Sequence, residues 1–190
     1  MLSISNDDPS NAVQLTDPDT EESTTLEVAL SILVDIDDGD PDSLYSVLEW
    51  SMDPSVVRFA QKYEMKIMIA AIKAFLFDSV TQYPPTGWQH IQVAAVLGEW
   101  ALCGRLIATL NHDMHNERDE VKEMRRMMDW RGWRQDDLDA LTQVRPKFVW
   151  AVCRAGMKHA GAKMDERINY EAMGEDVAKL MMMSVRFHTV

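Results

Sequence analysis

Few side chains in this 190-residue sequence are spaced for metal binding or nucleophilic catalysis. His112 and His115 stand three residues apart in a charged stretch, but a zinc site usually needs four converging nitrogen or sulfur ligands. We therefore interpret both as solvated histidines. Cys103 lies in the apolar stretch 100–104, which is typical of a helix interior, so we expect a buried thiol and not an activated nucleophile.

The short motifs that mark common active sites are also missing. The sequence contains no G-x-S-x-G and neither of the glycine-rich patterns that cradle a phosphate. We therefore predict no catalytic residue, no cofactor, no metal ion, and a protein that is not an enzyme. The alternative, an enzyme of an unrecognised helical class, predicts a pocket with a buried charge at Glu99 or Arg105. We expect these two side chains to be exposed or paired with each other.

Four aspartates lie between positions 35 and 40, around Gly39, in a run that could suggest a calcium-binding loop. The EF-hand loop needs glycine at its sixth position and glutamate at its twelfth. If Asp35 is first, Gly39 is fifth and Ser46 is twelfth; if Gly39 is sixth, Val34 is first. Neither register fits, so the run predicts an acidic turn.

One stretch combines arginines with tryptophans, a composition that can bind nucleic acid by charge and stacking. Acidic residues interleaved through the same stretch dilute its positive field, so we favour a tryptophan anchor into the core or into a protein partner. Tryptophan and arginine are enriched at the centres of protein interfaces. The expected partner contacts are Trp130, Trp133, Arg126, Arg131 and Arg134.

Charge is distributed unevenly along the chain. Residues 1–57 contain fourteen acidic residues and no lysine or arginine, whereas the remainder has seventeen acidic and nineteen basic residues. An unpaired acidic segment repels phosphates and anionic lipids, so we expect neither nucleic acid nor a membrane as partner. Residues 1–21 are polar, acidic and interrupted by two prolines, which predicts a mostly disordered lead-in.

The N-terminal residues, the lengths of the apolar runs and the two cysteines indicate the cellular compartment. The first residues show neither the basic nor the apolar region of a signal peptide, and no apolar run reaches the ~20 residues of a membrane span. Cys103 and Cys153 form no disulfide framework, and both lie in apolar stretches that favour buried free thiols. We expect a soluble intracellular protein, cytoplasmic or nuclear.

Helical periodicity recurs along the chain, and no long period-two alternation or tight hairpin signal appears, so the predicted class is mainly α. Thr24 and Glu27 fit a capping box, and Ser43 could cap a short helix that follows the acidic turn. Asp53 before Pro54 is a strong helix start. The most secure helix runs from about 65 to 80, with an apolar stripe at Met65, Met68, Ile69, Ile72 and Leu76.

The second half of the sequence predicts further helices. Residues 90–110 favour two helices or one kinked helix, divided at Gly98 and Gly104. A charged, exposed helix is expected over 112–129, with Glu120 and Met124 on one side and Val121 and Met128 on the other. Short helices are predicted over 135–144, from Pro146 with Phe148, Val149, Val152 and Met157 inside, and over 175–187.

The segment Ala60-Gln61-Lys62-Tyr63-Glu64-Met65 joins two of these predicted helices. The run from Leu15 to Leu33, the acidic, proline-containing turn after it, this segment and the helix Ile72-Lys73-Ala74-Phe75-Leu76 follow one another in an order that resembles the C-terminal half of fungal BTB/POZ domains. Residues 90–110 and 138–152 resemble the helices that follow in fungal members. The resemblance implies that Ala60, Tyr63 and Met65 are core positions of a helical hairpin and that the N-terminal half of the domain is missing.

We therefore expect the lead-in to be followed by a partial BTB-like helical region over 22–80 and a C-terminal helical region over 88–190. The resemblance implies an interaction or adaptor module whose partners are proteins, including a cullin or a second copy of the chain. The alternative is a helical, transcription-linked regulator whose acidic N-terminal tail recruits partners. Deleting residues 1–42 would separate the two, because the regulator would lose activity while its helical body stayed folded.

Overall fold

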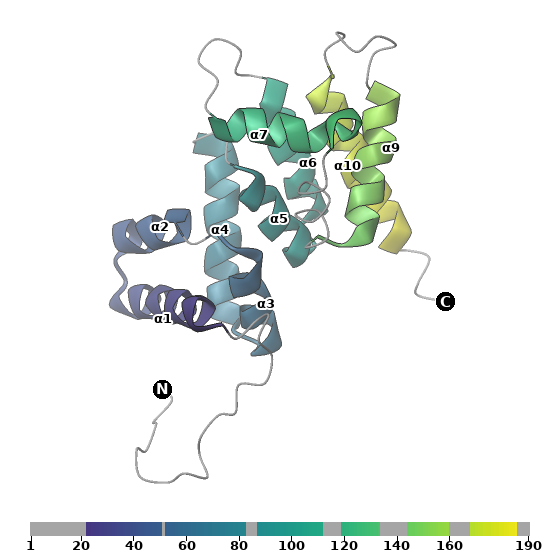
Figure 1. The fold of residues 1–190 in the computed structure, drawn as a ribbon. Coiled ribbons are helices and arrows are strands. Elements are labelled where there is room, and N and C mark those ends of the chain that lie inside the picture. Colours follow the sequence, from purple (N-terminus) through teal and green to yellow (C-terminus); the bar gives the residue numbers. More distant parts are fainter. Residues whose placement is uncertain are drawn as a thin grey trace.

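The computed structural model describes residues 22–50, 52–82, 87–111, 119–133, 144–159 and 168–185. Every regular element in these ranges is a helix, which confirms the predicted mainly α class (Figure 1). The elements are α1 (Ser23–Asp38), α2 (Pro41–Trp50), α3 (Pro54–Lys62), α4 (Lys66–Gln82), α5 (Trp88–Leu97), α6 (Trp100–Ala108), η2 (Thr109–Asn111), α7 (Asp119–Met128), η3 (Trp130–Gly132), α9 (Pro146–His159) and α10 (Tyr170–Val185).

The two predicted caps near the start of the chain are wrong. Helix α1 begins one residue before Thr24, and its N-cap Glu22 makes no side-chain cap hydrogen bond. Helix α2 begins at Pro41, because Asp40 accepts a hydrogen bond from the backbone N–H of Asp42 at 3.0 Å and a proline fits the first helical turn. The hydroxyl of Ser43 instead donates to Asp35 at 3.0 Å and ties α2 to the end of α1.

The hairpin of α3 and α4 follows its local sequence signals. Asp53 caps α3, accepting from the backbone N–H of Ser55 at 2.7 Å, which confirms the predicted start. Between the helices Glu64 adopts a left-handed conformation with φ 52°, and the N–H of Met65 donates to the carbonyl of Ala60 at 2.8 Å. Ala60 is fully buried.

The predicted stripe on α4 is confirmed at its centre. Met68, Ile72 and Leu76 are buried, whereas Met65 and Ile69 are only partly buried at its edge.

Helices α5 and α6 confirm the two-helix alternative for residues 90–110. Gly98 ends α5 in the left-handed conformation with φ 77°, where a residue without Cβ is favoured. Gly104 does not divide the segment. It lies inside α6 and faces Gly174 of α10, so closely that a Cβ at position 104 would be 2.5 Å from the Gly174 carbonyl oxygen.

Helix α7 is not the exposed helix that its charges suggest. Val121, Met124, Met127 and Met128 are all buried, so the prediction that Met124 and Val121 lie on opposite sides is wrong. Residues three, four and seven positions apart share one helical face, and this face packs against the rest of the molecule. Helix α7 lies within the charged helix expected over 112–129, and residues 112–118 of that prediction lie outside the described residues.

The last two helices place one methionine differently from the prediction. Helix α9 begins at Pro146 as predicted, with Phe148 and Val152 buried and Val149 half-buried, but Met157 is 58% exposed instead of inside. Gly156 is buried in α9, where a Cβ would be 3.0 Å from the ring of Trp130. Helix α10 begins at residue 170, earlier than the predicted 175. The lead-in over 1–21 and residues 135–143 of the predicted helix over 135–144 fall outside the described residues, and Val144 is buried in a bend before α9.

One hydrophobic core extends from α1 to α10. Figure 1 shows α1 and α2 at one end of the molecule, α9 and α10 at the other, and α5 and α6 between them. The two halves meet where α3 packs on α5 and α4 packs on α6. Among the described helices, none combines the length and the apolar character that crossing a membrane requires.

Candidate functional site

A hollow of about 230 Å³ opens on the surface between α4 and α6. Lys73 and Phe77 reach it from α4, where a spacing of four residues places them on one helical face. The other side chains come from Glu99 at the N-cap of α6 and from the first turns of that helix. The lining residues are Lys73, Phe77, Glu99, Ala101, Leu102 and Arg105.

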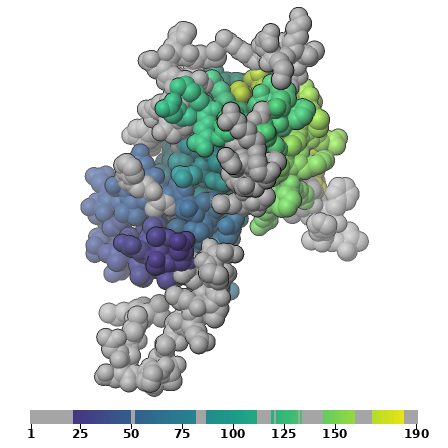
Figure 2. All heavy atoms as spheres, in the orientation of Figure 1, coloured from purple at the N-terminus to yellow at the C-terminus, as the bar shows by residue number. Residues whose placement is uncertain are grey.

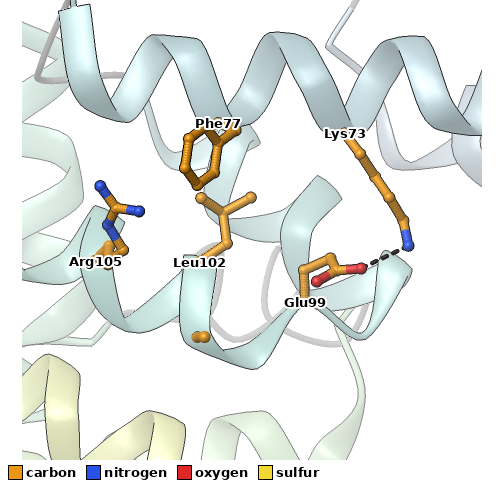
Figure 3. Close-up of a pocket in the computed structure, with 6 residues that line it drawn as sticks. Lys73, Phe77, Glu99, Leu102 and Arg105 are labelled. Carbon is orange, nitrogen blue, oxygen red and sulfur yellow. Dashed lines mark ion pairs between the residues drawn. The ribbon is translucent and has the colours of Figure 1, made fainter.

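Apolar side chains form the middle of the hollow, and charged side chains mark its two ends (Figure 3). Phe77 is 52% exposed and points toward Leu102, which is largely buried. At one end the ammonium of Lys73 lies 2.5 Å from a carboxylate oxygen of Glu99. At the other end the guanidinium of Arg105 lies 5.0 Å from the centre of the Phe77 ring, within the range of a cation–π interaction.

The electrostatics of the two ends differ. Glu99 and Lys73 neutralise each other, and both side chains keep about two fifths of their surface exposed, so water screens the pair. Arg105 is exposed and has an aromatic ring, not a carboxylate, under its guanidinium. The hollow therefore presents an apolar surface with a net positive charge at the Arg105 end.

The inward face of α6 explains why this site is held firmly. Cys103, Leu106 and Ile107 are buried on that face, and α10 packs against the same helix. The thiol of Cys103 is directed to the carbonyl of Ile91 in α5 at 3.9 Å, and burial raises the pKa of this thiol. The prediction that Cys103 is a core thiol is confirmed.

Comparison with protein-family models, curated proteins and solved structures finds nothing that matches this chain.

The predicted contact patch around Trp130 is largely committed to the core. Trp133 is half-buried, and its indole N–H donates to the carbonyl of Met127 at 3.0 Å. Trp130 is 37% exposed, with one edge of its ring against Gly156 of α9. The tryptophans therefore anchor η3 to α7 and α9 and leave only part of one ring for a partner.

The two described arginines of the predicted patch, Arg126 and Arg131, lie in different surroundings. Arg131 binds the carboxylate of Asp129 through two nitrogens, at 2.7 and 2.9 Å, and this pair lowers the pKa of Asp129. Arg126 is exposed on α7. Arg134 lies outside the described residues.

The other side chains considered for chemistry are two charged residues, a second cysteine and two histidines. Glu99 and Arg105 share one hollow, as the alternative of a pocket requires, but neither charge is buried: Arg105 is exposed, and Glu99 is partly exposed and pairs with Lys73 and not with Arg105. Cys153 is only half-buried, so the expectation of a fully buried second thiol is wrong. His112 and His115 fall in a part of the chain that the structure does not describe. Across the described ranges no cluster of three metal-ligand side chains occurs.

Sequence reasoning missed Phe77 as a surface residue. It belongs to the apolar run Phe75–Phe77, but one helical step of about 100° separates it from Leu76, which lies on the buried stripe. A helical projection of α4 could have separated Phe77 from Met68, Ile72 and Leu76. No sequence signal pairs Phe77 with Arg105, because the approach of α4 to α6 brings them together.

Proposed function

We propose that this chain is a non-enzymatic protein-interaction module, an adaptor that receives a partner's side chain in the α4–α6 hollow. The observation that carries the proposal is the exposure of Phe77. Its aromatic ring remains half exposed beside Arg105 in a hollow that is also lined by the buried Leu102. Aromatic and arginine side chains contribute most to binding when a partner excludes water from them. Covering an apolar surface of this kind makes the free energy of binding more favourable in proportion to the area that the partner covers.

The lining also indicates the chemistry of the partner's anchor. An aromatic or aliphatic side chain would cover Phe77 and Leu102. An adjacent carboxylate on the partner would meet Arg105, the end of the hollow where positive charge is not neutralised by an ion pair among the lining residues. We therefore infer a partner segment that combines one large apolar residue with one acidic residue.

The resemblance to the C-terminal half of fungal BTB/POZ domains is part of this proposal. The buried Ala60, the half-buried Tyr63 and the backbone hydrogen bond from Met65 to Ala60 agree with the hairpin that the resemblance implies. On this proposal the partners include a cullin or another copy of the chain.

A second candidate function is that of a transcription-linked regulator, favoured by the fourteen acidic residues and the absence of any base in residues 1–57. Deleting residues 1–42 would not separate the two functions cleanly, because α1 contributes Ala29 and Ile32 to the core. Deleting only residues 1–21 leaves every described helix in place. If the chain without residues 1–21 loses its cellular activity although its helices stay folded, the regulator is favoured over the adaptor.

Site-specific photo-crosslinking tests the adaptor proposal directly. A photoreactive phenylalanine analogue is placed at position 77 in the tagged full-length chain, and in parallel at Ile67, another exposed apolar residue of α4 that does not line the hollow. We expect a discrete crosslinked protein from the chain's own cells at position 77 and none at position 67. Arg105→Glu should abolish this product.

The controls separate loss of binding from loss of folding. Arg105 is exposed, so Arg105→Glu should keep the far-UV circular dichroism and the thermal midpoint of the wild type. Ala60→Asp is unsuitable as a binding control, because it places an unpaired charge at a fully buried position. Equal crosslinking at positions 67 and 77, or a product that survives Arg105→Glu, contradicts the hollow as the contact site.

A further inference from the structure

The outward face of α1 is apolar along its centre and acidic at its ends. Leu30 and Val34 are 61% and 56% exposed, one turn apart on the same face. Glu27 precedes them by one turn and Asp38 follows by one turn, and both are exposed. Helix α1 contains no basic residue.

The outward face of α9 has the opposite charge and a similar apolar centre. Trp150 and Met157 are 49% and 58% exposed and lie two turns apart. The guanidinium of Arg154 lies 5.3 Å from the centre of the Trp150 ring. Lys147 and Lys158 stand near the two ends of the helix, and α9 contains no acidic residue.

The two faces match in spacing. Glu27 and Asp38 are eleven residues apart, as are Lys147 and Lys158, so each charged pair spans about 16 Å of helix at 1.5 Å per residue. When α1 and α9 are laid antiparallel with these ends aligned, Leu30 and Val34 fall between Met157 and Trp150. Side chains spaced in this way interdigitate as ridges into grooves.

The other acidic groups near the end of α1 keep that face negative, and Lys158 keeps the end of the α9 face positive. Asp37 is exposed at the end of α1, and Asp35 is partly buried and held by Ser43. On α9 the ammonium of Lys158 also binds Asp176 of α10 at 2.5 Å but keeps two thirds of its side-chain surface exposed.

The two faces cannot cover each other within one molecule. Figure 1 shows α1 and α9 at opposite ends of the fold, and Figure 2 shows the purple surface of α1 on one side and the yellow-green surface of α9 on the other. Complementary faces at opposite ends of one molecule can meet only between two copies. Contact of this kind is head-to-tail and continues from copy to copy unless the rotation closes a ring.

We propose that the acidic, apolar face of α1 docks antiparallel on the basic, apolar face of α9 in a second copy of this chain. This self-association uses neither side of the α4–α6 hollow, so it is independent of the adaptor proposal. Because two helices bury little area for a stable complex, the association depends on concentration, and because ion pairs flank it, added salt weakens it.

Two complementary variants of the full-length chain test the head-to-tail geometry. Leu30→Lys/Val34→Lys places positive charges on the α1 face, opposite the basic face of α9, and leaves α9 intact. Trp150→Glu/Met157→Glu places negative charges on the α9 face, opposite the acidic face of α1, and leaves α1 intact. We expect the wild type to show a mass in sedimentation velocity that rises with protein concentration, under reducing conditions because of Cys153. Each variant alone should remain at the monomer mass of 21.7 kDa. Their equimolar mixture should stop at a one-to-one complex, because only one intact pair of faces remains.

Ile67→Lys/Met182→Lys replaces two other exposed apolar residues and should associate like the wild type. Unchanged far-UV circular dichroism establishes that the variants fold, and the salt dependence of the wild type provides a test without any mutation. A wild type that stays monomeric at every concentration overturns the proposal. So does a mixture in which the two variants fail to combine, or a wild-type complex that either variant alone leaves intact.

Discussion

The two sides of α6 are built differently. On the side facing α10, Gly104 and Gly174 bring the two helix backbones together with no room for a side chain. On the side facing α4, Leu102 and Phe77 face each other across an open hollow. One helix therefore serves two purposes: its α10 side holds the fold together, and its α4 side leaves apolar surface uncovered.

The same contrast predicts which substitutions affect stability and which affect binding. Changes on the α10 side should destabilise the fold strongly, because a close-packed backbone contact cannot relax. Changes in the hollow should have little effect on stability, because solvent already reaches those side chains.

The largest expected effect is that of Gly104→Ala. The new Cβ would lie 2.5 Å from the carbonyl oxygen of Gly174 and 3.0 Å from the Cβ of Ala178, so the helices must move apart. Overpacking costs about 1 to 3 kcal/mol of unfolding free energy, and we expect the upper end here because the obstacle is backbone. Urea denaturation measures the loss. Ala101→Ser, on the exposed side of the same helix, is the matched control, and an equal loss in both variants would remove the contrast between the two sides.

The next effect is a dependence on pH at His90, another interior position. Burial lowers the pKa of His90 from 6.5 to about 4, and its ring stacks on Phe75 at 6.0 Å. The unfolded chain therefore binds a proton that the folded chain excludes between pH 6.5 and 4. The contribution of neutral His90 to the free energy of unfolding is fully present above pH 6.5 and is lost as the pH decreases toward 4. Partial exposure reduces the effect, and we expect a loss of about 2 kcal/mol over this range.

Denaturation of the wild type and of His90→Phe at several pH values tests this expectation. The variant keeps an aromatic ring against Phe75 but cannot bind a proton, so the difference in unfolding free energy between the two proteins should change between pH 6.5 and 4. The comparison variant is His159→Phe, which replaces a histidine that contacts Asp176 near the surface. A difference that stays constant with pH for His90→Phe would show that His90 is not buried as a neutral ring.

The smallest expected effect is that of Phe77→Ala on stability. The ring is half exposed and its contact with Arg105 is a surface cation–π interaction, so the variant should lose about 1 kcal/mol or less. Leu106→Ala, on the inward side of α6, should lose about 2 to 5 kcal/mol in the same measurement. A large loss in Phe77→Ala would mean that the hollow is part of the structural core and not a surface kept for a partner.

Much of the fold could be predicted where a few neighbouring residues determine the outcome. The start of α3 at Asp53 and Pro54, the break at Gly98 and the start of α9 at Pro146 are all confirmed. The caps at Thr24 and Ser43 are wrong, because several polar residues near each helix start compete for the same backbone groups. Local rules identify the helix in such cases more securely than its first residue.

The candidate site was predicted only in fragments. Glu99 and Arg105 were recognised as charges among apolar neighbours, but Phe77 and Lys73 were not connected with them. The tryptophans at 130 and 133 have the composition of an interface, yet they pack mainly against the molecule itself. Composition identifies residues that bury well, and it does not say whether a partner or the same chain covers them.

Periodicity, capping chemistry and charge are local properties, so the helical class, the approximate positions of most helices and the acidic character of the first 57 residues follow from the sequence alone. Tertiary packing sets the close approach of Gly104 to Gly174, the burial of the methionines of α7 and the exposure of Phe77 and Met157. These outcomes depend on helices that are distant in sequence, and the free energy of burial depends on what lies on the other side of each surface.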